Sequence, residues 1–445
     1  MTRQPVPPFV PPGPPPADAT VRPILPADDR RHAAAGLRRL SRRALLALIG
    51  AGAATAFRRP LHADTGNGSR IARIDVFPVR YPMQGRFKFF EGPDGSPTGR
   101  AAVLVRITDA DGQVGWGESV PIPKWSEETL ETVETTLRRY IAPELIGHDS
   151  ADLAGAHAIM DRSIAPAFST GQPIAKAGID LALHDLIGRR AGRNVAMLWG
   201  RTPGVPLTLS WTVNPRTLDE VAPLVEAGRK LGYRHFNVKV APDPDFDVAM
   251  CKAVRKLAPD GFLWADANGG YAVEDALRAA PRLADAGVDV LEAPVRPNRI
   301  AAYQALMRQG ALPILMDEGV VSPDDLIEFI RLGMLAGVAM KPARCGGLLP
   351  ARQQIEILEA AGLQWLGSGL TDPDVSLAAT LALYSAYGQK RPCALNGPQF
   401  LAHSVVQQPF APRDGQLAPP RGPGLGVTVD EQKLQAILVK ESPHA

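Results

Sequence analysis

The chain has 445 residues, of which 45% are hydrophobic and 21% are charged, a composition typical of folded globular proteins. The net charge is only +3, and much of the basic excess lies before residue 60, so we expect no nucleic-acid partner. The three cysteines, Cys251, Cys345 and Cys393, are far apart in sequence, which argues against a disulfide framework or a structural zinc site.

Residues 1–63 are predicted to form a leader rather than part of a folded domain. The first 30 residues or so are rich in proline and should stay disordered. Arg42 and Arg43 then precede an apolar run, 44–56, which is shorter than the roughly 20 residues needed to span a bilayer. Paired arginines before such a run are typical of a twin-arginine export signal, with cleavage near Ala56 or Ala63. We therefore expect a periplasmic or extracellular protein without a stable membrane span; a buried or amphipathic helix is the alternative.

The second half of the chain alternates short apolar runs with helix-like stretches such as 219–231 and 322–332. This alternation is typical of a parallel sheet built from βαβ units, and eight strands predict a closed barrel rather than an open sheet. The predicted strands are 207–213, 235–240, 262–267, 288–293, 313–318, 337–342, 363–369 and 393–397.

Five ionisable residues stand at the C-terminal ends of consecutive predicted strands: Lys239, Asp266, Glu292, Asp317 and Lys341. Their spacing of about 25 residues corresponds to one strand–helix unit, and in a β/α barrel these strand ends form the face that holds the active site. Period-two alternation directs both lysines into the barrel while their apolar neighbours face the helices. One such residue alone could be an ordinary loop residue, but the regular series predicts a single site.

The residue types in this series predict metal-assisted proton transfer. Three carboxylates at adjacent strand ends repel one another unless a cation neutralises them, and their hard oxygen atoms suit Mg²⁺ or Mn²⁺. A cation bound to a substrate carboxylate stabilises the enediolate that forms when the neighbouring carbon loses its proton. Lys239 and Lys341 flank the carboxylates and can act as acid and base, which at neutral pH requires lowering a lysine pKa by about three.

These strand-end residues occur within motifs that resemble those of the enolase superfamily, and within it the muconate lactonizing enzyme-like subgroup of the mandelate racemase/muconate lactonizing enzyme family. The resemblance covers about residues 70–430. It implies a modified (β/α)8-type, TIM-like barrel (201–398) with an α+β N-terminal capping domain (68–200) and a C-terminal segment (399–445) that packs on the cap. The motifs that carry it are Gly115-Trp116-Gly117-Glu118-Ser119, residues 180–186, Asp266-Ala267-Asn268, Glu292-Ala293-Pro294, Asp317-Glu318, Lys341-Pro342, Cys345-Gly346-Gly347 and Asn396-Gly397-Pro398.

The resemblance also implies roles for individual residues. Asp266, Glu292 and Asp317 would bind Mg²⁺ or Mn²⁺, and Lys239 and Lys341 would form the acid/base pair. The substrate would be a small-molecule carboxylate, and the protein would be a homo-oligomer. The candidates for supporting the metal ligands or contacting substrate are Asn237, Asn268, Glu318, Arg86, Lys88 and Asp372.

The sequence also departs from the family pattern. Asn237 stands where many members carry the first lysine of a Lys-x-Lys motif. Ala394 and Asn396 stand where dipeptide epimerases carry Asp-x-Asp, which argues against a dipeptide substrate. Asp372 belongs to an Asp-Pro-Asp sequence that is first of all a turn signal.

Substrate selection is expected in two cap loops, 81–99 and the loop around Trp125. In the first loop, Arg86, Lys88 and Phe90 would meet a distal anionic or aromatic group, with an ordinary solvated loop as the alternative.

We favour racemisation or epimerisation, because two lysines are present and no histidine–aspartate pair of the mandelate racemase type is evident. A cycloisomerase or a dehydratase of the same superfamily is the first alternative. The second is an exported carboxylate- or metal-binding homologue without catalytic activity. The third is a polysaccharide-modifying barrel, which would use two facing carboxylates and no metal.

Overall fold

The computed structural model describes residues 69–439, which lie within one compact unit spanning Ala63–Ala445. The proline-rich leader, the arginine pair and both candidate cleavage positions fall outside the described residues, so the export signal stays a prediction. Between residues 69 and 439, no helix is long and apolar enough to cross a membrane.

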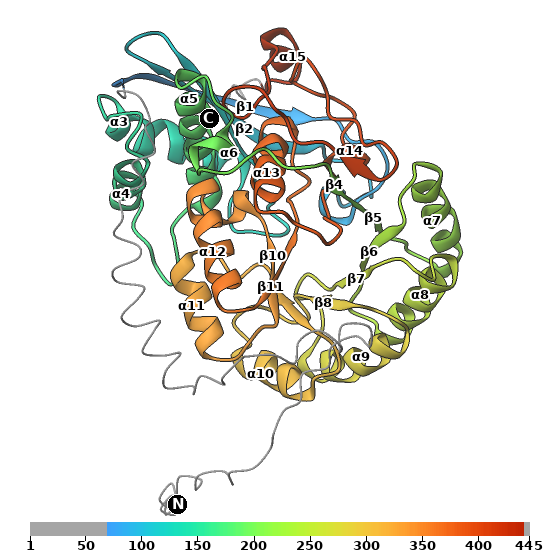
Figure 1. Ribbon diagram of the computed structural model, residues 1–445. Coiled ribbons are helices and arrows are strands. Elements are labelled where there is room, and N and C mark those ends of the chain that lie inside the picture. The colour runs from blue at the N-terminus through green and yellow to red at the C-terminus, as the bar shows by residue number, and fades with distance from the viewer. Residues whose placement is uncertain (1–68, 440–445) are drawn as a thin grey trace, which may run out of the picture. The chain divides into compact units, whose positions relative to one another are not determined.

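The N-terminal part of the described chain is an antiparallel sheet flanked by helices (Figure 1). Strands β1 (Ile71–Tyr81), β2 (Arg100–Asp109) and β3 (Val114–Ser119) pair in that order. Helix α5 (Pro173–Arg190) packs directly on β3. This close approach requires glycine, because a Cβ atom at Gly117 would lie 1.9 Å from the carbonyl oxygen of Gly178. The other cap helices are α2 (Leu130–Thr135), the π-helical turn η3 (Thr136–Ile141), α3 (Ala142–Leu145), α4 (Leu153–Ser163) and α6 (Val195–Leu198).

The C-terminal part contains the predicted parallel sheet, whose strand order is β11-β10-β9-β8-β7-β6-β5, so that strands consecutive in the chain are neighbours in the sheet. The strands are β5 (Ser210–Val213), β6 (His235–Lys239), β7 (Leu263–Asp266), β8 (Val290–Glu292), β9 (Ile314–Met316), β10 (Gly337–Met340) and β11 (Gln364–Gly367). The helices that alternate with them are α7 (Val221–Lys230), α8 (Pro244–Leu257), α9 (Val273–Asp285), α10 (Ile300–Gln309), α11 (Pro323–Arg331), α12 (Leu348–Ala360) and α13 (Asp374–Ala386). The expected TIM-like barrel with an α+β cap is therefore confirmed.

Two predicted strands differ from expectation. The eighth is reduced to parallel bridges in which Cys393 pairs with Leu209 and Ala394 pairs with Ser368, and these bridges connect the two outer strands of the sheet. The chain then turns into α14 (Gly397–Phe400). The first predicted strand is divided, because its beginning, β4 (Leu207–Thr208), pairs with the distant β12 (Gln416–Leu417) instead.

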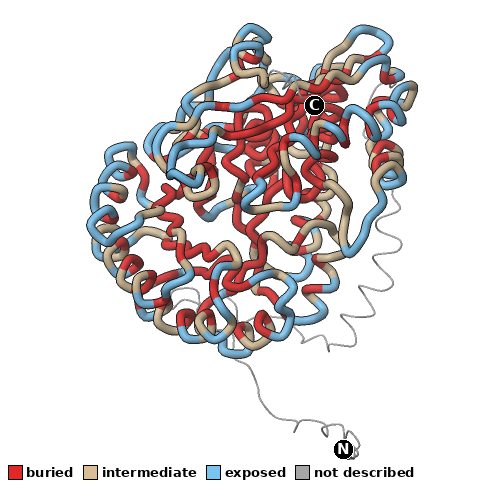
Figure 2. Tube along the Cα trace, turned by 180° about the vertical axis from the view of Figure 1, so that it is seen from behind, coloured by how far each residue is buried: buried red, intermediate tan, exposed pale blue. Residues whose placement is uncertain are grey.

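Side chains of the parallel strands separate into two packed groups, as period-two alternation predicts. Val238, Val338 and Met340 belong to the large core shared with the helices, whereas Ala339 belongs to a small separate cluster. That inner cluster consists of Trp264, Val290, Leu315, Ala339, Leu366 and Ala394. In Figure 2 buried residues are concentrated in the strands and the cap, and exposed residues lie on the outer helices.

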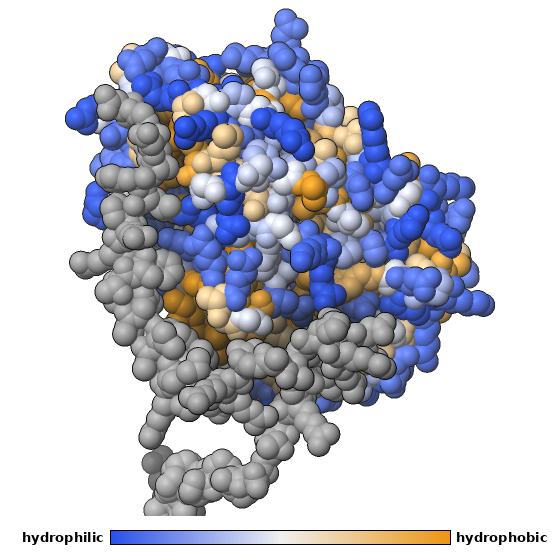
Figure 3. Space-filling view, viewed as in Figure 1, coloured by the Kyte–Doolittle hydropathy of each residue, from blue (hydrophilic) through white to orange (hydrophobic). Residues whose placement is uncertain are grey.

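The C-terminal segment returns to the cap sheet. The backbone N–H of Arg80 donates to the carbonyl of Ile437 at 3.0 Å, and the N–H of Val439 donates to the carbonyl of Pro78 at 2.9 Å. These bonds attach the residues after α15 (Glu431–Ala436) to strand β1. On the face shown in Figure 3, hydrophilic side chains dominate wherever the described residues are visible, and hydrophobic side chains form small groups among them. The expected homo-oligomer stays a prediction.

A buried carboxylate joins the cap to the barrel. Asp180 on α5 accepts a hydrogen bond from the backbone N–H of Leu348 at the start of α12, and His157 Nε2 lies 2.8 Å from its Oδ2 atom. Burial alone would raise the pKa of Asp180, but the neighbouring His184 and His157 outweigh burial and leave that pKa lowered.

We expect Asp180→Asn to lower the free energy of unfolding by about 3 kcal/mol at pH 7, because it removes one partner of a buried charged network. Since the folded-state pKa of Asp180 is lowered, this contribution is present above the unfolded pKa of about 3.9 and is lost as the pH falls toward the folded value. Urea denaturation of wild type and variant at several pH values measures the difference. The exposed Asp219→Asn variant is the control, and a difference that did not shrink in acid would contradict the assignment.

Candidate active site

The five predicted strand-end residues meet at one edge of the parallel sheet. Lys239, Asp266 and Glu292 are the last residues of β6, β7 and β8 and are paired in register, while Asp317 and Lys341 directly follow β9 and β10. All except Lys239 are buried, and the Lys239 side chain is only 10% exposed. Five ionisable groups are thus gathered in a region that excludes most water.

Ion pairs connect these residues into one cluster. Lys239 Nζ lies 2.5 Å from Asp266 Oδ2, while Lys341 Nζ lies 2.5 Å from Asp317 Oδ2 and 3.2 Å from Glu292 Oε1. The two lysines therefore stand at opposite ends of the row of carboxylates. Lys239 has one carboxylate partner, whereas Lys341 is held by two.

The cluster shifts the pKa values of its members in different directions. Burial opposes ionisation of Asp266, but Lys239 and Lys341 outweigh burial and its pKa is lowered. For Glu292, burial and the charge of Asp266 raise the pKa well above its usual value. Burial lowers the pKa of Lys341, but Asp317 and Glu292 outweigh it, so the pKa is raised. This direction is opposite to the expected lowering, because Lys341 lies between two carboxylates whose negative charge favours the ammonium form.

The three carboxylates are chemically suited to a hard divalent cation. Their oxygen atoms come from neighbouring strands about 4.8 Å apart, and they are the ligand type that Mg²⁺ and Mn²⁺ prefer. Across residues 69–439, however, no three acidic, histidine or cysteine side chains are arranged to hold a metal ion together. The lysine ammonium groups lie against the carboxylate oxygens that a cation would also use. The donor set fits a divalent cation, and the role of these residues as metal ligands stays a prediction.

A small pocket lies directly over the cluster, between the barrel and the cap. It has a volume of about 30 Å³ and is lined by both lysines and by cap residues that include Phe87 and Trp125. The Nζ atom of Lys239 lies 5.8 Å from the centre of the Phe87 ring, and that of Lys341 lies 5.4 Å from the centre of the Trp125 ring. This volume holds about one water molecule, so a substrate needs more room than the small pocket alone provides.

Three of the predicted supporting residues lie near the cluster. Asn268 donates from its backbone N–H to Asp266 Oδ1 at 2.9 Å and from Nδ2 to Asp266 Oδ2 at 3.1 Å, and so orients this carboxylate. Asn237 is buried on β6, and neither polar atom of its side chain has a hydrogen-bond partner among the described residues. Glu318 has a buried Oε1 atom without a partner there, and burial followed by the charge of Asp317 raises its pKa to about 8.

Other predicted substrate contacts point elsewhere. Arg86 is bound to Glu91 at 2.7 Å and to the carbonyl of Asn214 at 2.8 Å, and it lies outside the described pocket linings. Phe90 is buried beneath the guanidinium of Arg100 instead of facing the pocket, which its neighbour Phe89 lines.

Asp372 serves the turn after β11. Its Oδ1 atom accepts a hydrogen bond from the backbone N–H of Leu370 at 3.3 Å and from the Ser376 hydroxyl at 3.1 Å. Residues 368–371 line the small pocket, whereas Asp372 is not among its lining residues. The contacts of Asp372 therefore fit a role in stabilising the turn better than a role in binding substrate.

Lys88 lies in the cap loop beside the cluster, with its Nζ atom 5.2 Å from the centre of the Phe89 ring. Burial, followed by the nearby charge of Lys239, lowers the pKa of Lys88 to about 8. We therefore expect this ammonium to lose its charge as the pH rises through about 8. Carbon-13 NMR of the reductively methylated protein should show one lysine resonance with that midpoint. The resonance should be missing from Lys88→Arg, and its persistence in that variant would refute the assignment.

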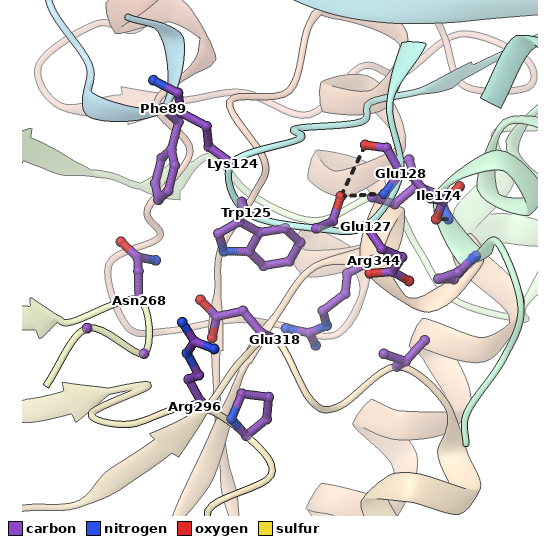
Figure 4. A pocket seen from close by; sticks show the side chains of 16 residues that line it. Phe89, Lys124, Trp125, Glu127, Glu128, Ile174, Asn268, Arg296, Glu318 and Arg344 are labelled. Atoms are coloured by element: carbon purple, nitrogen blue, oxygen red, sulfur yellow. Dashed lines mark hydrogen bonds between the residues drawn. The ribbon is translucent and has the colours of Figure 1, made fainter. Parts of the chain in front are cut away.

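A second, larger cavity of about 510 Å³ adjoins the small pocket and shares Phe89, Trp125 and Asn268 with it. Figure 4 shows Arg296 and Glu318 extending into it from the barrel side and Trp125 from the cap side. Arg344 also lines this cavity and forms an ion pair with Asp317. The sequence analysis did not identify Arg296 or Arg344, although both follow strand-end residues of the predicted series within the same loops.

Comparisons with protein families and with individual proteins indicate the same family. The family described as "Mandelate racemase / muconate lactonizing enzyme, N-terminal domain" matches residues 95–200, and "Enolase C-terminal domain-like" matches residues 219–433. Chloromuconate cycloisomerase CbnB of Cupriavidus necator is 33% identical over 375 residues, covering 81% of this chain and 96% of that protein. Muconate cycloisomerase 1 of Rhodococcus opacus is 31% identical and covers 75% of this chain and 90% of its own length.

A solved structure agrees with the sequence relatives. The muconate lactonizing enzyme from Pseudomonas fluorescens complexed with muconolactone has a TM-score of 0.77 at 28% identity, covering 84% of this chain and 100% of that one. The named relatives favour the cycloisomerase alternative over the racemase or epimerase that we preferred from the sequence. The chain belongs to the mandelate racemase/muconate lactonizing enzyme family, as an enzyme of the muconate lactonizing enzyme-like subgroup of the enolase superfamily.

Proposed function

We propose that this protein is a divalent-metal-dependent cycloisomerase that converts an unsaturated dicarboxylate into a lactone. The observation that carries the proposal is the lysine–carboxylate cluster at the strand ends, in a chain whose relatives over four fifths of its length are named cycloisomerases. A divalent cation held by Asp266, Glu292 and Asp317 would supply positive charge to the substrate carboxylate next to the reacting carbon.

The reaction balances without a further reactant. One carboxylate oxygen adds to a carbon of the double bond, and the electron pair moves to the carbon next to the other carboxylate, which becomes an enediolate. A proton delivered to that carbon completes the isomerisation. Lys239 is the donor in this proposal, because it lines the pocket and is held by a single carboxylate. Lys341, held by two carboxylates, stabilises the negative charge from the other end of the row.

Racemisation or epimerisation is the second candidate. It is favoured by the presence of a lysine at each end of the carboxylate row, since exchange of a proton between two faces needs one acid and one base. In a cycloisomerase only one lysine has to transfer a proton, so the two functions differ in what they require of Lys341.

Proton NMR of the protein with Mg²⁺ in D₂O tests the proposal. Unsaturated dicarboxylates should yield a lactone that carries one deuterium next to its free carboxylate. Exchange of an α-proton without ring formation, in a pool of carboxylic and amino acids, would favour the racemase or epimerase. If the protein bound Mn²⁺ but neither cyclised nor exchanged any of these acids, the non-catalytic binding protein would be the better interpretation.

We also propose that the protein is exported through the twin-arginine route. The support is the arginine pair Arg42–Arg43 directly before the apolar run 44–56. The full chain expressed in a bacterium with this route should be found in the periplasm, and a variant with both arginines changed to lysine should stay in the cytoplasm. Periplasmic recovery of both forms would refute this route.

A further inference from the structure

The cavity next to the small pocket offers room that the pocket itself lacks. The pocket over the lysines holds about 30 Å³, whereas the neighbouring cavity holds about 510 Å³, within the size range of ligand sites of about 300–1,000 Å³. Phe89, Trp125 and Asn268 line both, so a molecule held at the lysines would extend past these three side chains into the larger space.

Arg296 is placed at this cavity by paired loops. The loops that follow β7 and β8 are joined by a hydrogen bond of 2.7 Å from the N–H of Gly269 to the carbonyl of Ala293, and by a bridge between Gly270 and Val295. A Cβ atom on Gly269 would lie 3.5 Å from the Cα atom of Arg296, so the two backbones pack closely. The backbone at Arg296 is therefore positioned by the pairing of these two loops.

Three other charged residues that line the cavity form contacts within the protein. Arg344 is paired with Asp317, and Lys124 donates to the carbonyl of Glu91 at 2.5 Å. Glu128 accepts from the N–H groups of Ile174 and Ala175 at the start of α5, at 2.7 and 2.8 Å. The buried Oε1 atom of Glu318 and the guanidinium of the exposed Arg296, which also line the cavity, have no such partner within residues 69–439.

We propose that Arg296 binds the carboxylate of the substrate that is remote from the carbon protonated at the lysine cluster, and thereby selects dicarboxylates. The planar guanidinium presents paired N–H donors that match the two oxygens of a carboxylate. Figure 4 shows this side chain on the barrel side of the cavity, extending toward the space below Trp125. The assignment rests on the proposed cycloisomerase function, because that reaction needs a second carboxylate held in a fixed position.

Binding can be measured without turnover. In the Mg²⁺-loaded protein, calorimetric titration should show that hexanedioate binds at least about tenfold more tightly than hexanoate, because one charge-assisted contact contributes about this factor. Arg296→Met should abolish the difference and Arg296→Lys should restore only part of it. The matched control is Arg299→Met, an exposed arginine at the start of α10 that should retain the full preference.

Kinetics separates this inference from the proposed function. For a dicarboxylate that the wild type cyclises, Arg296→Met should raise KM about tenfold with little change in kcat, the pattern of a group that binds substrate and transition state alike. Cyclisation with an unaltered KM in this variant would overturn the Arg296 site and leave the function intact. A preference for hexanedioate that depends on Arg296, in a protein that cyclises nothing, would overturn the function and leave the site intact.

Discussion

Lys239→Ala should lower kcat for lactone formation by a factor of about 10² to 10⁴, the usual contribution of a positioned general acid or base. Lys239 is the pocket-lining lysine with a single carboxylate partner, at 2.5 Å from Asp266, so its ammonium can leave that carboxylate to reach a substrate. The loss should appear in kcat rather than in KM, because proton delivery is realised only in the transition state. Rates are measured by NMR, from the appearance of the lactone signals.

The controls for this variant address structure and charge separately. Asp266 keeps its hydrogen bonds from the backbone and side chain of Asn268, so its orientation should survive the loss of Lys239. Lys239→Met retains the volume of the side chain without the amine and should be equally inactive. Lys230→Ala, at the exposed end of α7, should have wild-type activity. Full activity of Lys239→Met would show that another group delivers the proton.

Lys341→Ala distinguishes the two candidate functions, because each function requires a different property of Lys341. A cycloisomerase needs Lys341 only as a positive charge, so Lys341→Arg should recover much of the lost rate. A racemase needs it as a proton-transfer group, which arginine cannot replace because it does not deprotonate in proteins. Lys341 lies between Glu292 and Asp317. The alanine variant therefore also removes the positive charge that reduces repulsion between these two buried carboxylates.

The sequence was most informative where a repeating pattern determines the geometry. The spacing of the five strand-end residues placed them at one edge of the sheet, and alternation along β6 and β10 separated the lysines from the core side chains. Where the pattern was too short, the prediction was incomplete. The pairing of β4 with β12 involves two residues on each side, from segments distant in sequence, and no local signal identifies such a contact.

The cap loop shows why the substrate contacts were harder to predict. Its only helical element is the short 3₁₀ turn η2 (Lys88–Phe90), so no sustained periodicity tells which of Arg86, Lys88 and Phe89 faces the pocket. Arg86 was suitable by charge, but Glu91 in the same loop binds it. Arg296 was missed for a similar reason, because its position depends on a pairing between two loops that follow different strands.

Glu292→Gln should weaken the binding of a divalent cation at least about tenfold, since even residues that only support metal ligands contribute factors of that size. Glu292 occupies the central strand of the three, paired in register with Asp266 and joined through Lys341 to Asp317. Gln has nearly the same shape but no negative charge, so the variant tests charge rather than packing. Electron paramagnetic resonance of free Mn²⁺ measures the binding directly, without an assay of activity.

The outcome decides between two interpretations of the buried cluster. If the carboxylates are metal ligands, wild type should bind Mn²⁺, Glu292→Gln should bind it weakly, and the exposed Glu328→Gln on α11 should match wild type. If Glu292→Gln bound Mn²⁺ as wild type does, the lysines would be the permanent counter-charges of these carboxylates. The row would then be a structural ion-pair network, because a buried carboxylate whose loss leaves cation affinity unchanged cannot be one of the ligands.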